Sequence, residues 1–159
     1  MFTLRAAEDR DFPALLAIDA ACFNPAIRYA QRELRQFMAV RGAFTLVAET
    51  ATTPATAAGF ILAVGAARGG HIITIDVLPA FRRSGLGRQL LEAAEARIAK
   101  QGAKHVQLEA AVDNSAALAF YRRQGYRAVA TLPGYYPGGL DGWRLVKELA
   151  AAPAAAERG

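Results

Sequence analysis

Two residue types with distinctive chemistry are nearly missing from the sequence: it has one cysteine, Cys22, and two histidines, His71 and His105. A single cysteine cannot form an intrachain disulfide, a CxxC redox pair or a cysteine-rich zinc site. Neither histidine stands in an HExxH motif or near a second candidate ligand, so we expect no metal site. The scarcity therefore excludes most metal and thiol chemistry.

Long apolar runs are also absent. The longest, residues 57–67, is about half of the ~20 residues that a membrane-spanning helix needs. The first twelve residues, MFTLRAAEDRDF, carry charges and lack the apolar core of a signal peptide. We therefore expect a cytoplasmic protein with no membrane partner. The net charge of +5 favours an anionic ligand, but it is too modest to predict a nucleic-acid partner.

The 159 residues fit one domain, and a 53% hydrophobic content with low net charge excludes extensive disorder. We expect a single domain over 1–150 and a frayed, alanine-rich tail over 151–159. Residue periodicity predicts helices within 8–22, around 34–42, over 87–100 and over 116–124. It predicts strands over 2–6, 44–49, 59–64, 71–78, 106–111, 126–132 and 143–149. This order indicates an α/β fold with one mixed sheet and helices on both faces. The sequence leaves a monomer and a homodimer equally open.

The most informative stretch lies between a predicted strand and the helix expected over 87–100. It contains Arg82, Arg83, Gly85, Gly87 and Arg88. Glycines let backbone N–H groups converge, and a helix N-terminus presents unpaired N–H groups with a positive dipole end. The arginines add positive charge at the same point. The pattern predicts a phosphate-binding turn, whereas the alternative is an ordinary two-glycine turn with a solvated basic face.

The segment Arg82-x-x-Gly85-x-Gly87 resembles the Q/R-x-x-G-x-G/A motif of the GNAT superfamily of acyl-CoA N-acyltransferases. The resemblance implies a twisted mixed sheet of about seven strands and acetyl-CoA as co-substrate. It also implies that the backbone of the preceding strand, at Ile75, Asp76 and Val77, pairs with the pantetheine arm. The motif residues would then surround the pyrophosphate: Arg82, Arg83, Ser84, Gly85, Leu86, Gly87 and Arg88.

Within that superfamily the sequence most resembles the ribosomal-protein-alanine N-acetyltransferase branch. The branch pattern L-E-V-R-x-x-N corresponds to Leu108 to Asn114, where Ala110 and Ala111 stand in place of its valine and arginine. A tyrosine before a G-[FY] pair and a later YYP also match. By resemblance, Glu109 is the general base, Tyr121 the general acid and Asn114 a CoA contact. The matching loop tyrosines, Tyr135 and Tyr136, are candidates for substrate binding.

The chemistry of amine acetylation independently requires such groups. An amine attacks a thioester only when it is neutral, so a base must remove a proton, and a departing thiolate leaves more readily when an acid protonates it. Each candidate also has a structural alternative: Glu109 in an ion pair, Tyr121 in the core, and Tyr135 and Tyr136 in loop packing. Asp76 is either a local salt bridge or a second carboxylate for the amine.

These observations predict an N-acetyltransferase that acts on a primary amine, most simply a protein or peptide N-terminal α-amine, by direct attack in a ternary complex. No acyl-enzyme is expected, because Ser84 and Ser115 lack a GxSxG context and Cys22 lies far from the motif in sequence. The alternatives are a small-molecule amine or lysine as acceptor, or a non-catalytic CoA-binding regulatory module.

Overall fold

The computed structural model describes residues 1–150, and the expected tail over 151–159 lies outside this range. The sheet is formed by β1 (Phe2–Ala6), β2 (Ala43–Thr50), β3 (Ala57–Val64), β4 (Gly70–Val77), β5 (His105–Ala111), β6 (Arg127–Leu132) and β7 (Gly142–Glu148). The α-helices are α1 (Phe12–Cys22), α2 (Gln31–Met38), α3 (Leu86–Lys100) and α4 (Ser115–Arg123). Every strand and helix expected from the sequence is present, with ends displaced by only a few residues. No helix within 1–150 is both long and apolar enough to cross a bilayer.

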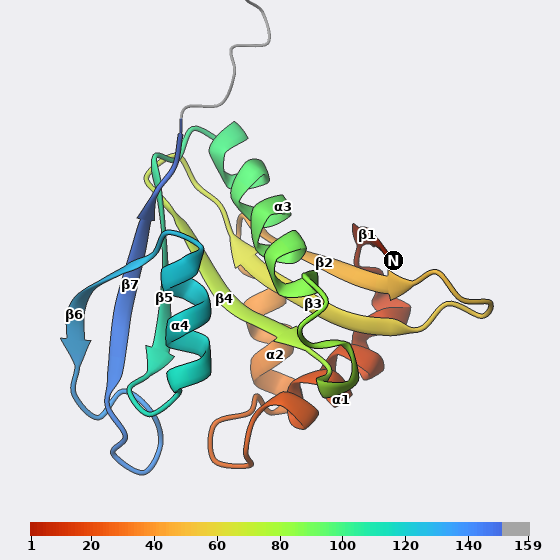
Figure 1. Ribbon diagram of the computed structural model, residues 1–159, viewed down its shortest axis with the longest axis horizontal. Helices are drawn as coiled ribbons and strands as arrows, with labels where there is room; N and C mark the ends of the chain where they lie inside the picture. Colours follow the sequence, from red (N-terminus) through yellow and green to blue (C-terminus); the bar gives the residue numbers. More distant parts are fainter. Residues whose placement is uncertain (151–159) are drawn as a thin grey trace, which may run out of the picture.

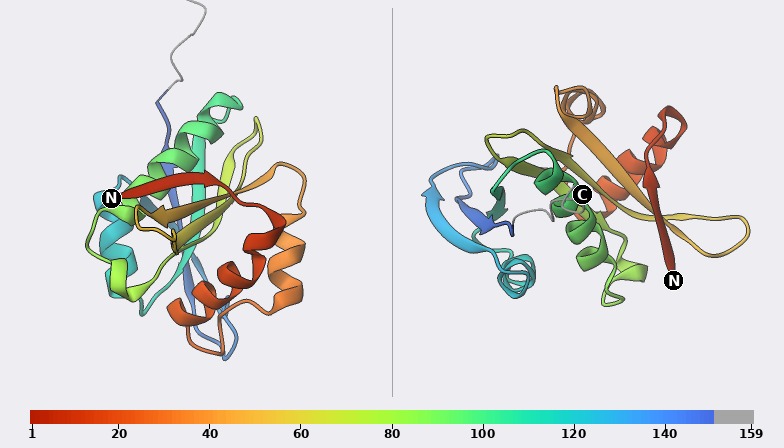
Figure 2. Two further views of the ribbon diagram at one scale, coloured as in Figure 1. Left: turned by 90° about the vertical axis from the view of Figure 1, so that its right-hand side faces the viewer. Right: turned by 90° about the horizontal axis from the view of Figure 1, so that it is seen from above.

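The seven strands form one sheet in the order β1-β2-β3-β4-β5-β7-β6. All neighbouring strands are antiparallel except β4 and β5, which are parallel and joined through α3. Helices α3 and α4 lie on one face of the sheet, while α1 and α2 lie on the other (Figures 1 and 2). The expectation of a mixed sheet with helices on both faces is confirmed.

Each face of the sheet has its own core. Leu90, Leu91 and Ile98 of α3 pack against one face, and Leu15 of α1 and Leu34 of α2 pack against the other. Strand β3 lies between the two cores and is buried at every position except its ends. This explains why its sequence, AAGFILAV, is apolar throughout and does not alternate.

Strands β4 and β5 separate soon after they meet. They pair only at Gly70↔Val106 and His71↔Gln107, and the rest of each strand has no partner across this boundary. The register between β3 and β4 also shifts at the Leu62/Ala63 step, a bulge that bends β4 where the separation begins. The widening gap between β4 and β5 is visible in Figure 1. Backbone groups along the facing edges are therefore left free to bind a ligand.

Candidate active site

A cleft of about 1040 Å³ opens where β4 and β5 part. Its walls come from β4, β5, the turn before α3, the helix α4 and the segment between α1 and α2. Its lining includes Ile75, Val77, Arg82, Arg83, Gly85, Gly87, Arg88, Glu109, Asn114, Tyr121 and Tyr136. Eleven of the residues singled out from the sequence thus meet at one place.

The turn before α3 is built as the glycine pattern requires. Gly85 caps the helix in the left-handed region at φ 83°, with no heavy atom within 4 Å of the position where a Cβ would lie. Arg83 also has a positive φ, 62°, which is uncommon for a residue with a side chain. A Cβ at Gly87 would lie 3.3 Å from Cζ of Phe120. The first turn of α3 therefore presents backbone N–H groups to the cleft without side chains over them.

The basic side chains around this turn differ in what they contact. The Arg82 Nε donates to the Val77 carbonyl oxygen over 2.9 Å, and Arg88 pairs with Glu92 on the exposed side of α3. The Ser84 hydroxyl turns back to the Phe81 carbonyl, and the Leu86 side chain is buried in the core. Ser84 and Leu86 do not line the cleft, so only their backbone groups remain candidates for the expected phosphate contact.

The three expected backbone positions on β4 are not equivalent. The Leu78 N–H donates to the Ala58 carbonyl, and hydrogen-bonded pairs alternate along an antiparallel ladder. The N–H and C=O groups of Ile75 and Val77 therefore point away from β3, toward the gap, whereas those of Asp76 point to β3. Ile75 and Val77 line the cleft and Asp76 does not.

The local salt bridge expected for Asp76 is absent from residues 1–150. Strand alternation turns its side chain toward α1, and Asp76 is not among the residues that line the cleft. Its carboxyl group is 1% exposed and accepts a hydrogen bond from the Thr74 hydroxyl. Burial and a neighbouring carboxylate, Asp19, raise the pKa of Asp76 well above the usual range.

Glu109 lies on β5, and its side chain is 9% exposed. The Nε2 of His71 lies 2.7 Å from Oε1 of Glu109, and the Nε of Arg144 on β7 lies 3.7 Å from Oε2. The carboxylate is therefore oriented on one oxygen by a hydrogen bond, while the other faces a cation. The ion pair expected as the structural alternative is present, and Glu109 also lines the cleft.

Tyr121 likewise belongs to both the core and the cleft. Its ring is packed edge-on against Phe120 and Tyr126, with centroids 5.3 Å and 5.9 Å away. Burial is the main cause that raises the pKa of the Tyr121 phenol, so the hydroxyl keeps its proton throughout the neutral range. Asn114 caps α4 as expected: its Oδ1 accepts from the Ala117 N–H over 3.1 Å.

The two loop tyrosines, Tyr135 and Tyr136, differ in their exposure to the cleft. Their rings meet edge-to-face with centroids 4.9 Å apart, but only Tyr136 lines the cleft, while Tyr135 is 48% exposed. Burial is the main cause that raises the pKa of each phenol. The pair thus forms a rim in which Tyr136 faces inward.

Sequence reasoning did not identify three polar neighbours of the site: His71, Arg144 and Tyr29. The side chain of His71 is 36% exposed, yet its ring holds Glu109. Tyr29 lines the cleft from the segment between α1 and α2. No local motif marks these residues, because their contacts cross strands and loops far apart in sequence.

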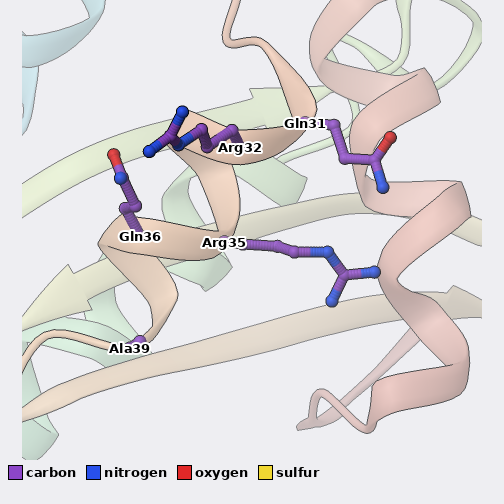
Figure 3. A pocket seen from close by; sticks show the side chains of 5 residues that line it. All are labelled: Gln31, Arg32, Arg35, Gln36 and Ala39. Carbon is purple, nitrogen blue, oxygen red and sulfur yellow. The ribbon is translucent and has the colours of Figure 1, made fainter.

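A second, shallower hollow of about 550 Å³ lies along α2 and is lined by Gln31, Arg32, Arg35, Gln36 and Ala39. Figure 3 shows Arg35 extending toward α1, while Arg32 points to the other side of the helix. The Arg35 guanidinium lies 3.8 Å from the centroid of the Phe12 ring, which holds it in place. This hollow contains none of the expected site residues and no acid or base pair.

A mixed sheet that opens between two central parallel strands, with a glycine turn at a helix N-terminus beside the opening, defines a class of α/β fold. The chain belongs to the acetyltransferase (GNAT) family, whose model matches residues 7–126. The sequence-based resemblance to this family is confirmed.

Individual relatives agree with this assignment. The N-alpha-acetyltransferase of Saccharolobus solfataricus is 35% identical over 83 residues, which are 52% of this chain and 50% of the relative. The chain thus spans about half the length of the curated relatives it matches. The crystal structure of the ribosomal-protein-S18-alanine N-acetyltransferase from Escherichia coli superimposes with a TM-score of 0.83 over 98% of both chains, at 23% identity. The structure of the NatC complex bound to Gag peptide and CoA gives a TM-score of 0.79 over 94% of this chain and 99% of that one, at 21% identity.

Proposed function

We propose that the protein transfers an acetyl group from acetyl-CoA to a primary amine, and that the acceptor is the N-terminal α-amine of a protein or peptide. The observation that carries the proposal is the meeting of Glu109, Tyr121 and the glycine turn in one cleft. A carboxylate, a phenol and an anion-binding helix N-terminus are the groups that proton removal, proton donation and phosphate binding require. Family membership supports the same chemistry.

The cleft fits the proposed co-substrate on its own geometry. The first turn of α3, opened by Gly85 and Gly87, would hold the pyrophosphate, with Arg82, Arg83 and Arg88 around it. The backbone groups of Ile75 and the N–H of Val77, which point to the gap, would bind the pantetheine amides, while the Val77 carbonyl is held by Arg82. When bound, acetyl-CoA supplies an activated acetyl thioester.

Glu109 would act on the acceptor. An α-ammonium group must lose one proton before its nitrogen can attack, and the carboxylate of Glu109 is the group in the cleft that can accept it. The hydrogen bond between His71 and Oε1 would fix the orientation of the carboxylate in the cleft. Arg144 keeps the carboxylate from being an isolated buried charge.

Tyr121 would act on the leaving group. Because burial raises the pKa of this phenol, its hydroxyl is protonated at neutral pH and can donate. Within residues 1–150 the Tyr121 hydroxyl forms no hydrogen bond, and the residue lines the cleft. It is therefore suited to give its proton to a thiolate sulfur as the thiolate forms.

The choice of an α-amine rests on the acceptor side of the cleft and on the relatives. Tyr29 and Tyr136 supply an aromatic rim next to Glu109, a surface that a peptide backbone can pack against. The archaeal relative is named an N-alpha-acetyltransferase, and the NatC structure contains a peptide.

The acceptor is tested by measuring CoA release and product mass with three kinds of amine: peptides with free N-termini, peptides with only lysine amines, and small amines. Acetylation of lysine or of small amines alone would contradict the proposed acceptor, and no CoA release with any amine would favour a non-catalytic CoA-binding module.

A leucine in place of Gly87 should weaken CoA binding about tenfold or more, which corresponds to ~1.4 kcal/mol. The new side chain would press on Phe120 and cover the turn that presents its N–H groups to the phosphates. Calorimetric titration with CoA measures the effect. The matched control is Gln89→Leu, an exposed position of the same helix outside the cleft. If both variants bound CoA with equal affinity, the result would contradict a phosphate site at this turn.

The Tyr121→Phe variant should bind CoA normally and lose about 10²-fold or more in kcat, the usual range for a missing general acid. The substitution removes only a hydroxyl, so the ring packing with Phe120 and Tyr126 stays intact. The control is Tyr126→Phe, whose hydroxyl donates to Glu95 in the core over 2.7 Å. That variant should lose stability and keep its kcat. A Tyr121→Phe variant as fast as the parent would leave Tyr121 with a packing role alone.

The Glu109→Gln variant should lose most in kcat/KM below the pKa of the acceptor amine and recover partly above it. The reason is that an amine that arrives neutral no longer needs a base. General-base removal costs about 10²–10⁴-fold, and glutamine retains an oxygen for the contact with His71. A pH–rate series at saturating acetyl-CoA measures this, with the buried Glu95→Gln as a control for carboxylate loss outside the cleft. Parallel pH profiles of parent and variant would contradict the role as base.

A further inference from the structure

Two buried carboxyl groups lie on α1 and β4, which pack against each other on the face of the sheet opposite α3. Asp19 on α1 is 0% exposed and Asp76 on β4 is 1% exposed. The Thr74 hydroxyl donates to Oδ1 of Asp76, and the Tyr29 N–H donates to Oδ2 of Asp19 over 2.7 Å. Within residues 1–150 neither carboxyl group forms a salt bridge. Residues 1–150 thus bury two acids with no cation in contact with either.

The other oxygen of each group has no protein partner within the described part of the chain: Oδ1 of Asp19 and Oδ2 of Asp76. A buried polar atom without a hydrogen bond is costly, and two adjacent buried carboxylates would also repel each other. One proton removes both problems, because an O–H on Asp76 can donate to the carboxylate of Asp19. Burial and Asp19 are also the leading causes that raise the pKa of Asp76.

We propose that Asp19 and Asp76 share a single proton, and that the resulting acid–carboxylate bond positions Tyr29 and the segment between α1 and α2 against β4 on the acceptor side of the cleft. The pair takes up this proton from solvent when the chain folds. The proton then lies between one oxygen of Asp76 and one of Asp19. Asp19 and Asp76 are positioning residues and do not face the cleft. The consequence for acceptor binding rests on the proposed function.

The contacts of Tyr29 show what the pair holds. Its N–H is bound by Asp19, its hydroxyl lies 3.5 Å from the Ile73 carbonyl, and its ring packs on Phe37 with centroids 5.3 Å apart. One turn after Asp19, the Cys22 thiol donates to the Val77 carbonyl over 3.4 Å. Tyr29 and Cys22 both line the cleft. Loss of the shared proton would place two negative charges under this wall and weaken the contact at the Tyr29 N–H.

The other ionisable groups near the pair do not replace the proton. Burial raises the pKa of the Cys22 thiol, and it is the main cause that raises the pKa values of the Tyr29 and Tyr121 phenols, so all three are neutral at pH 7. Arg82, beyond the end of β4, lowers the pKa of Asp76 through its charge, but this cause ranks below burial and Asp19. Strand β3 presents only apolar residues and glycine to this region.

The direction of the pH effect follows from proton uptake. Asp76 in the unfolded chain ionises near ~3.9 and in the folded chain at higher pH. The stabilising contribution of the pair is therefore complete below about pH 4 and is lost progressively as pH rises toward the folded-state pKa. Above that pKa, the segment between α1 and α2 is held less tightly against β4 at Tyr29.

The test uses Asp76→Asn and Asp19→Asn as matched isosteric variants. In either variant an amide N–H can replace the shared proton at every pH. Each should therefore gain thermal stability relative to the parent as pH rises from 5 to 9, because the folded parent binds on the order of one proton more than its unfolded chain. Infrared spectra at neutral pH should show the carbonyl band of a protonated carboxylic acid in the parent and lose it in both variants. A parent without that band would overturn the proposal.

Hydrogen exchange at the Tyr29 amide measures the positioning role. After correction for intrinsic exchange, its protection in the parent should fall by up to about tenfold per pH unit until the pair has ionised, whereas protection in Asp76→Asn should not change with pH. Where acetyl transfer occurs, the acceptor KM of the parent should rise with the same pH dependence and that of Asp76→Asn should not. Equal pH dependence of Tyr29 exchange in parent and variant would overturn the inference. Absence of acetyl transfer would count against the proposed function alone, because the infrared and exchange data do not depend on turnover.

Discussion

The parting of β4 and β5 after two residue pairs is the constraint on which the rest of the site depends. A continuous ladder would consume the backbone groups of Ile75 and Val77 and leave no space between the strands. Because the strands separate, the first turn of α3 and the cleft face of α4 meet across an opening that the two cores keep in shape. The bulge beside Ile73 gives this separation a fixed starting point.

Strand alternation then decides which ionisable side chains face the cleft. Along β4, Ile75 and Val77 line the cleft, while the intervening Asp76 is turned under the sheet. On β5 the same period places Leu108 in the core with α3 and directs Glu109 to the side of His71 and Arg144. A shift of one residue in either strand would exchange a core residue for a carboxylate. The register of the sheet is therefore as important to the site as the residues themselves.

The sequence was sufficient to predict the elements, the mixed sheet and the glycine turn before α3, because their signals are local: apolar period, capping residues and two glycines one residue apart. It could not reveal that Glu109 bonds to His71, 38 residues away, or that Asp76 meets Asp19. These pairs form only when the strand order and register are known. Ser84 and Leu86 illustrate the same limit, since the motif includes them but helix geometry directs Leu86 into the core and Ser84 back to its own turn.

The composition of the cleft also bears on which amine the site can activate. At pH 7 roughly a tenth of a free α-amine with a pKa of ~7.7–8.0 is neutral, whereas for lysine, at ~10.4, the neutral fraction is below about one in a thousand. The base must therefore offset about one pKa unit for an α-amine and more than three for lysine, or ~1.4 against more than ~4 kcal/mol. With Asp76 turned away, Glu109 is the only carboxylate among the cleft residues within 1–150. The proposed α-amine acceptor therefore makes the smaller demand on Glu109, a single carboxylate already engaged by His71 and facing Arg144.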